Sequence, residues 1–344
     1  MMWKTGCVLA FTGLLTAAPL PGAETPATAL LVLSKSDQTL AIVDPGNHQV
    51  VAKIPSGPDP HEVVASADGR LAFISNYGGG RYNTITVVDL VGQKVQSTVD
   101  LGALRGPHGL DFQGGKVWFT AETAKVIGSY DPVSQKIDLV LGTGQNRTHM
   151  IAVARDLKWI VTSNVNSATM TFIEKSSARV GTGGPAGAMG PAPQEWEETV
   201  VAVGRGAEGF DISPDGAELW AANALDGTIS LLDVGSKKVL HTLAAEVAGA
   251  NRLKFTPDGQ LVFVSTLRGP ELTILDARTR RTLKRVRMGR GAAGIQMEPG
   301  GARAYVACTP DDYVAIVDLK TLEVTGRLEV GKQPDGMAWA VRGQ

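Results

Sequence analysis

The sequence predicts an all-β protein, a seven-bladed β-propeller whose last blade combines strands from both ends of the 344-residue chain. Three observations predict this fold: an internal repeat of about forty residues, seven recurrences of one strand ending, and incomplete repeat units at the two ends. The composition agrees, because 41 glycines and 18 prolines favour short strands joined by turns over long helices.

The repeat is clearest in three segments that align on one turn and one terminal acid: FDISPDGAELWAANALDGTISLLD, LKFTPDGQLVFVSTLRGPELTILD and IQMEPGGARAYVACTPDDYVAIVD. Each predicts an apolar strand, a PDG-type turn, a second strand, a loop and a third strand, followed by a fourth strand such as KKVLHTL. The fixed φ of Pro and the tolerance of Gly suit a tight connection between antiparallel strands. Four strands per unit make one propeller blade.

Seven predicted third strands each end in an acidic residue, which indicates seven blades. These acidic residues are Asp44, Asp89, Asp131, Glu174, Asp233, Asp276 and Asp318. The chain begins with a second and a third strand, ALLVLSK and TLAIVD, and it ends with a first strand, DGMAWAV. Joining residues near 28–55 to residues 335–341 completes the seventh blade and leaves no open sheet edge between the first and last blades.

The N-terminal 23 residues have the composition of a secretory signal peptide. One Lys precedes an apolar run from Cys7 to Ala18, and small residues and prolines follow. The run is too short to span a bilayer. We therefore expect residues 1–23 to be removed, residues 24–344 to form a single propeller domain, and the protein to be periplasmic or secreted with no membrane span. Cys308 is then the only cysteine, so no intramolecular disulfide is expected.

The repeats SPDGAELWAAN…GTISLLD, ADGRLAFISN…NTITVVD and PGGARAYVAC…DYVAIVD resemble the YVTN-type β-propeller repeat of many exported bacterial and archaeal proteins, over essentially all of residues 24–344. The resemblance implies the fold but not one activity. That repeat family and similar seven-bladed propellers include surface-layer and nucleic-acid-binding proteins without catalysis. They also include lyases, lactonases and haem- or metal-containing oxidoreductases.

Three of the five histidines share one position of the repeat, four residues before the end of the first strand. The seven residues at this position are His61, His108, His149, Glu208, Asn251, Ala293 and Asp335. First strands line the central channel, so these side chains should converge at one mouth. His61, His108, His149 and Glu208 come from four consecutive blades and predict a metal-binding or catalytic ring.

Three imidazoles and a carboxylate suit a divalent transition metal (Zn, Fe, Cu, Ni or Mn) better than Ca. The alternative is a solvated mouth without metal, because polar side chains line many propeller channels. Residues 176–198 form a Gly/Pro-rich insertion between a third and a fourth strand. Because successive strands alternate in direction, we expect this insertion on the face opposite the histidines. We interpret it as a linker; the less favoured alternative is a segment that docks a partner through Trp196.

Cationic residues gather in the loops that enter the first strands. They are Arg105, Arg147, Arg205, Arg252, Arg290 and Lys332. We expect them to bind a small anionic substrate, supported by Asn251 and Asp335, although entry loops are commonly basic for solubility alone. A nucleic-acid partner is disfavoured but stays open, since the net charge is −1 and only Tyr77 and Tyr82 offer stacking surfaces near the mouth.

Two classes of function follow. The first is an exported metal-dependent enzyme of the lyase, lactonase or oxidoreductase type, in which the ring holds the metal. One of the histidines, or Glu208, would then act as a base instead of a metal ligand. The second is a non-catalytic binding or scaffold propeller that recognises a protein, cell-wall or nucleic-acid partner. We expect a monomer in either case.

Overall fold

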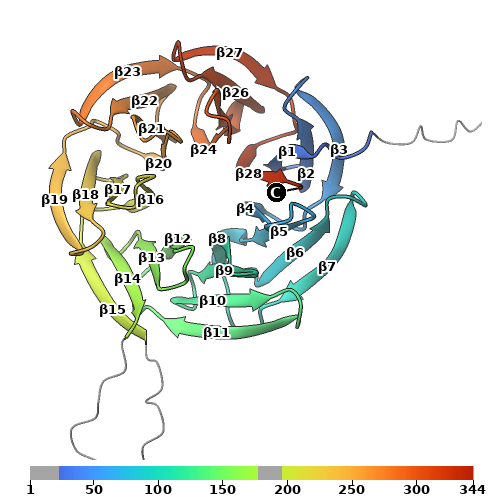
Figure 1. The fold of residues 1–344 in the computed structure, drawn as a ribbon, viewed down its shortest axis with the longest axis horizontal. Coiled ribbons are helices and arrows are strands. Elements are labelled where there is room, and N and C mark those ends of the chain that lie inside the picture. The colour runs from blue at the N-terminus through green and yellow to red at the C-terminus, as the bar shows by residue number, and fades with distance from the viewer. Residues whose placement is uncertain (1–22, 177–195, 344) are drawn as a thin grey trace, which may run out of the picture.

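The computed structural model describes residues 23–343 except 177–195, and it confirms the seven-bladed propeller (Figure 1). Its described elements are strands apart from two short 3-10 helices, η1 (Gly78–Gly80) and η2 (Thr309–Asp311). The signal peptide expected at residues 1–23 falls, except for its last residue, outside the described residues.

We number the blades along the chain and give the strands of each from the channel outward. Blade 1 contains β4 (Pro60–Ala65), β5 (Leu71–Asn76), β6 (Thr84–Asp89) and β7 (Lys94–Asp100). Blade 2 contains β8 (Pro107–Gln113), β9 (Lys116–Ala121), β10 (Val126–Asp131) and β11 (Lys136–Gly142). Blade 3 contains β12 (Thr148–Val153), β13 (Trp159–Asn164), β14 (Thr169–Lys175) and β15 (Trp196–Ala202). Blade 4 contains β16 (Ala207–Ile212), β17 (Glu218–Asn223), β18 (Thr228–Asp233) and β19 (Lys238–Leu243).

The remaining blades close the circle. Blade 5 contains β20 (Ala250–Phe255), β21 (Leu261–Thr266), β22 (Glu271–Asp276) and β23 (Arg281–Arg287). Blade 6 contains β24 (Ala292–Met297), β25 (Arg303–Cys308), β26 (Tyr313–Asp318) and β27 (Glu323–Leu328). Blade 7 contains β28 (Pro334–Val341), β1 (Thr28–Ser34), β2 (Thr39–Asp44) and β3 (Gln49–Pro55).

Blade 7 joins the two ends of the chain, as the sequence predicted. The C-terminal strand β28 pairs antiparallel with β1, with Leu30 opposite Trp339 and Val32 opposite Met337. Figure 1 shows the blue N-terminal strands and the red C-terminal strand side by side. This pairing closes the ring, so the last blade does not expose a free inner edge.

The repeat motifs have local structural causes. In the SPDG turn, the side chain of Asp215 accepts hydrogen bonds from the Ser213 hydroxyl and the Ala217 N–H, and Gly216 has a φ of +75°. The acid at the end of the third strand caps the next turn: Asp233 accepts from the Ser236 N–H at 2.6 Å. These contacts explain why the turn and the terminal acid recur together.

The hydrophobic core lies between neighbouring blades. In one cluster, Leu31 and Ile42 of blade 7 pack with Ile74 and Val88 of blade 1, all fully buried. Most outermost strands are instead largely exposed, as the pattern of β7 shows. Each blade therefore buries its two faces against its neighbours, and the stacking fixes where the inner strands meet.

The insertion predicted at residues 176–198 connects β14 to β15. Strand β14 begins at the mouth that carries the start of β12 and ends at Lys175 on the opposite face, because β12, β13 and β14 are antiparallel in turn. The ammonium of Lys175 lies 5.3 Å from the ring centroid of Trp196, where β15 begins. Residues 177–195 lie outside the described residues.

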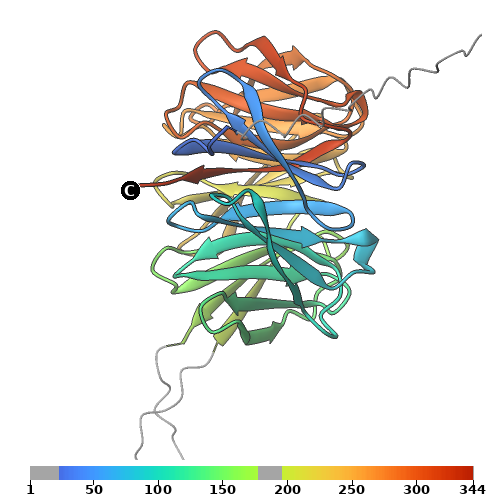
Figure 2. The same ribbon diagram turned by 90° about the vertical axis from the view of Figure 1, so that its right-hand side faces the viewer.

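Two further observations bear on the sequence expectations. Cys308 is a free, fully buried cysteine at the end of β25. Within the described part of the chain, no helix has the length and apolar character needed to cross a membrane. The side view shows strands throughout the thickness of the disc (Figure 2).

Candidate metal centre at the channel mouth

The seven residues aligned at one repeat position occupy equivalent places in all seven blades. Each is the second residue of its innermost strand and lies where the register with the next strand shifts at a β-bulge. In ring order they are His61, His108, His149, Glu208, Asn251, Ala293 and Asp335. All seven line one cavity at the mouth of the channel. A bulge re-aims the side chain that it carries, which turns this position toward the channel.

Hydroxyl groups on the second strands tie neighbouring blades together at this position. The hydroxyl of Ser75 donates to the carbonyl of His108 at 2.9 Å, and that of Thr120 donates to the carbonyl of His149 at 2.7 Å. Thr120 also accepts from the N–H of Gly109 at 2.9 Å. A Cβ at Gly109 would lie 2.5 Å from the His149 carbonyl oxygen, so glycine allows these strands to approach closely.

The three histidine rings lie in a row along one side of the mouth. The ring centroids of His61 and His108 are 4.4 Å apart, and those of His108 and His149 are 3.7 Å apart. Burial lowers the pKa of His61 to about 4, and burial together with the neighbouring histidines lowers the pKa of His108 well below its ordinary value. Nδ1 of His108 is buried without a hydrogen-bond partner in the described structure. An unpaired nitrogen on a neutral imidazole is a suitable metal ligand.

His149 lies between two carboxylates. Its Nδ1 contacts Oε1 of Glu122, and its Nε2 lies 3.1 Å from Oε1 of Glu208. Burial alone would lower the pKa of His149, but these two carboxylates outweigh burial and raise it. Burial would raise the pKa of Glu208, yet His149 and Arg147 lower it to about 2. The pocket is therefore built to hold positive charge on or beside this imidazole.

Glu122 belongs to a second ring that the sequence reasoning missed. The ring is formed by the residue that directly follows each second strand: Lys35, Tyr77, Glu122, Val165, Ala224, Leu267 and Thr309. Each of these residues donates its backbone N–H to a carbonyl in the loop before the first strand of the same blade. Aligning the ends of the second strands, as was done for the first strands, would have found Glu122 and Lys35. The hydroxyl of Tyr77 donates to Oε2 of Glu122 and fixes the orientation of that carboxylate.

His108, Glu122 and His149 form a group that could hold a metal ion. One ligand atom from each residue lies within 4.8 Å of the others, and all three side chains are buried. Around a tetrahedral ion with metal–nitrogen distances of about 2.0–2.1 Å, neighbouring ligand atoms are about 3.3 Å apart. The three side chains would have to rotate to bring their ligand atoms to that spacing. Two imidazoles and one carboxylate are a ligand set of catalytic zinc, which leaves a coordination position open.

His61 has a different environment from the other two histidines. The ammonium of Lys35 donates to Nδ1 of His61 at 2.9 Å and lies 3.3 Å from Oδ2 of Asp335. Nε2 of His61 lies 3.9 Å from the same Asp335 oxygen. The structure thus brings His61, His108, His149 and Glu208 together, but it places a cation beside His61 and a carboxylate beside His149.

The predicted cationic residues divide into two groups. Arg147 and Arg252 line the cavity at the mouth, as do the predicted supporting residues Asn251 and Asp335. Arg205 and Arg290 are instead exposed and form ion pairs with Asp226 and Asp311, each at 2.7 Å, while Arg105 is exposed and donates to the Arg81 carbonyl at 2.9 Å. None of these three lines the cavity, and neither does the exposed Lys332, which lines a hollow between blades 6 and 7.

An ion pair across the channel separates this cavity from the space below it. The guanidinium of Arg252 on β20 contacts Oε1 of Glu62 on β4. Above the pair, the mouth cavity has a volume of about 200 Å³. Below it, a second cavity of about 340 Å³ follows the channel and is lined by both Glu62 and Arg252. The mouth is therefore a small chamber with a charged floor.

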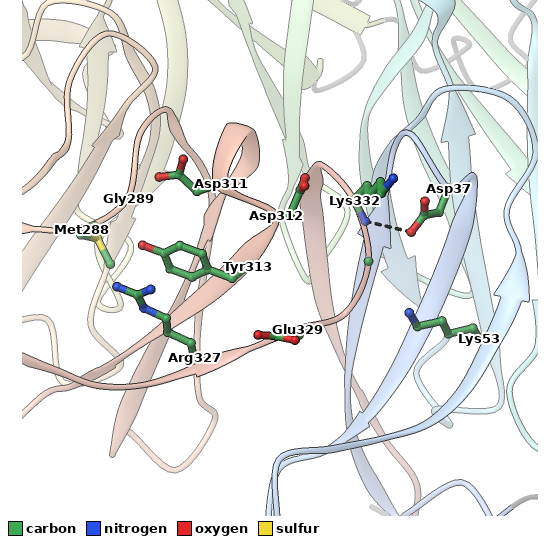
Figure 3. A pocket seen from close by; sticks show the side chains of 11 residues that line it. Asp37, Lys53, Met288, Gly289, Asp311, Asp312, Tyr313, Arg327, Glu329 and Lys332 are labelled. Atoms are coloured by element: carbon green, nitrogen blue, oxygen red, sulfur yellow. Dashed lines mark hydrogen bonds between the residues drawn. The ribbon is translucent and has the colours of Figure 1, made fainter.

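A larger hollow than this chamber lies elsewhere in the described part of the chain. It measures about 830 Å³, is open to solvent, and lies between blades 6 and 7 (Figure 3). Its charged side chains have both signs, and the guanidinium of Arg327 lies 4.3 Å from the ring centroid of Tyr313. No histidine lines it. The side chains that line the two cavities therefore favour the smaller chamber at the mouth as the functional site.

Comparison with known proteins establishes the fold. No family model matches the chain, and no curated protein matches it in sequence. Solved structures do resemble it. A protein of unknown function from Desulfotomaculum acetoxidans has a TM-score of 0.73 at 12% identity, with 92% of this chain and 99% of that chain covered.

Two enzymes are among the similar structures. The dihydro-heme d1 dehydrogenase NirN, in complex with DHE, has a TM-score of 0.63 at 18% identity over 94% of this chain and 78% of the other. Hydrazine synthase from Kuenenia stuttgartiensis has a TM-score of 0.68 at 15% identity over 90% of this chain and 99% of the other. In all, 1573 chains of solved structures match. Similarity at this level identifies a β-propeller and does not select one activity.

Proposed function

We propose that this protein binds a divalent transition metal through His108, Glu122 and His149 and acts on a small anionic substrate as a lyase, lactonase or oxidoreductase. The observation that carries the proposal is the buried group of two imidazoles and a carboxylate, with ligand atoms within 4.8 Å of one another. The group borders a small chamber at the channel mouth, where a substrate could reach the open coordination position.

The proposal gives Glu122 the ligand role and Glu208 an orienting role. A metal-bound imidazole commonly donates its second N–H to a carboxylate, which holds the ring in place. Glu208 suits that role because its Oε1 lies 3.1 Å from Nε2 of His149. His61 is left outside the ligand group because the Lys35 ammonium, 2.9 Å from its Nδ1, would repel a metal cation.

The bound metal would act as a Lewis acid that polarises an oxygen of the substrate. Arg147 is suited to binding the anionic end of the substrate, since its side chain is 36% exposed and its guanidinium reaches Glu122 and Glu208 only at 3.6 and 3.4 Å. Donors of the guanidinium that do not face these carboxylates could bind a carboxylate or phosphate. His61 lines the same chamber, and it could act as a base only once the Lys35 ammonium no longer donates to its Nδ1.

Metal analysis tests the proposal directly. Protein purified without chelator or a nickel column should contain about one transition-metal ion per chain, or take up zinc at that ratio. His108→Ala and Glu122→Gln should each weaken zinc binding by at least about tenfold. His241→Ala, on the exposed outer strand β19, is the matched control and should bind zinc as the wild type does.

The carboxylates can be distinguished by the same titration. Glu208→Gln keeps the shape of the side chain and an oxygen near Nε2 of His149, so we expect a smaller loss than in Glu122→Gln. Equal zinc affinity in the wild type and in His108→Ala would contradict the assignment of His108 as a metal ligand. A wild-type protein that holds no metal and takes up no Zn, Cu, Fe, Ni or Mn would leave the non-catalytic scaffold as the better function.

We also propose that the protein is exported to the periplasm or secreted. The support is the leader-like composition of residues 1–23, with one Lys, an apolar run and small residues. Mass spectrometry of the natively expressed protein should find a mature N-terminus near residue 24. An intact N-terminal methionine on cytoplasmic protein would contradict export.

A further inference from the structure

The chamber at the mouth has one charged side. Its opposite side, called the apolar side below, carries the side chains of Leu267 and Ala293 beside the polar Asn251, Arg252 and Thr309. From this we infer that the substrate of the proposed enzyme is a small monocarboxylate with a short alkyl group, held with its carboxylate at the metal side and its alkyl group against Leu267 and Ala293. This inference rests on the proposed function and adds the chemical class of the substrate.

The volume of the chamber limits the size of the ligand. About 200 Å³ corresponds to roughly seven water molecules at their volume in the liquid. The floor formed by Arg252 and Glu62 prevents a longer ligand from extending down the channel. A molecule of about four to seven non-hydrogen atoms fits this space.

The charged side comes from blades 2 and 3. His108 and Glu122 belong to blade 2, and His149 belongs to blade 3, next to Arg147 in the loop before β12. The side chains of His108 and His149 are almost completely buried, and Arg147 is the cation that is both exposed to the chamber and only loosely paired. A carboxylate fits here because it can bind the metal and a guanidinium at once.

The apolar side lies across the ring. Leu267 directly follows the second strand of blade 5, and Ala293 is the ring residue of blade 6. In a closed ring of seven blades, blades 5 and 6 are the two that face blade 2 (Figure 1). Leu267 is 53% exposed although it lines a chamber with many charged groups. An exposed leucine in such a place gains free energy when an alkyl group covers it.

A second carboxylate would fit poorly on this side. Its charge would lie against Leu267 and Ala293, which have no polar atoms to replace the lost water. The other two cations that line the chamber are already paired, Lys35 with His61 and Asp335 and Arg252 with Glu62. The arrangement therefore favours butyrate over acetate, because of the added methylenes, and butyrate over succinate, because of the second charge.

Isothermal titration of the zinc-loaded protein with acetate, butyrate and succinate tests the inference. We expect butyrate to bind about tenfold more tightly than acetate, since each buried methylene contributes up to about fourfold. Succinate should bind at least about tenfold more weakly than butyrate. In Leu267→Asn the affinity for butyrate should fall by about tenfold while that for acetate is unchanged, and Leu267→Lys should favour succinate.

Leu225→Asn is the matched control, because Leu225 is a 60% exposed leucine on blade 4 that does not line the chamber. It should leave all three affinities unchanged. Equal affinities for acetate and butyrate, or an equal loss of both in Leu267→Asn, would overturn the inference while leaving the metal site intact. If the protein takes up no zinc, the proposed function fails. The same chain-length series on the metal-free protein, with Arg147 as the anchor, then decides whether the apolar side selects alkyl groups.

Discussion

The ion pair between Arg252 and Glu62 spans the channel, and its removal should measurably destabilise the fold. The side chains are 7% and 13% exposed, so the pair is largely shielded from water. Glu62→Gln would leave the guanidinium buried without its closest carboxylate. Breaking a buried pair by removing one partner costs about 3–5 kcal/mol. We expect the lower end, about 3 kcal/mol, because Arg252 also contacts Oδ1 of Asn251 at 3.3 Å and feels the charges of Asp335 and Glu208.

This free energy converts into a shift that thermal unfolding can resolve. The entropy of unfolding of a domain of about 320 residues is about 0.7 kcal/mol per kelvin, so a loss of about 3 kcal/mol lowers Tm by about 4 °C. The assay is thermal unfolding followed by circular dichroism. The double variant Glu62→Met/Arg252→Met should recover most of the loss, because well-packed apolar side chains can replace a buried pair.

The control is Asp226→Asn, which removes the exposed partner of Arg205 and should leave Tm unchanged. A wild-type Tm in Glu62→Gln would show that the floor of the chamber is not held by this pair. A double variant as unstable as Glu62→Gln would show that the loss comes from packing and not from the unpaired charge.

Gly109→Ala should lower both Tm and zinc affinity, because its Cβ would lie 2.5 Å from the carbonyl oxygen of His149, whereas Gly142→Ala meets no atom within 4 Å and should change neither. Burial raises the pKa of Asp111 above the ordinary 3.8, so the folded state binds this proton more tightly and Asp111 stabilises the fold less as pH rises above 3.8. Urea unfolding at several pH values should therefore show the stability of Asp111→Asn improving relative to wild type from low to neutral pH, and a constant difference would contradict this. Burial also raises the pKa of the Cys308 thiol, so a thiol reagent should label this residue only after unfolding. The measurement uses protein that begins at residue 24, in which Cys308 is the one cysteine.

The sequence by itself determined the fold and one ring of residues. The repeat fixes four strands per unit, and the incomplete units at the two ends require closure within one blade, as the pairing of Leu30 with Trp339 confirms. Equivalent positions of a repeat must occupy equivalent places around a propeller. For that reason alone, the shared position of His61, His108 and His149 was enough to place them at one mouth.

Tertiary structure alone decided which residues meet. Glu122 follows a second strand and is far from His149 along the chain, and only the packing of blade 2 against blade 3 brings the two side chains into contact. Likewise, Lys35 reaches His61 because closure of the ring sets blade 7 beside blade 1. A repeat pattern specifies the height and orientation of each side chain within its own blade. The contacts between blades depend on distances across the interface, which the side chains of both blades set together.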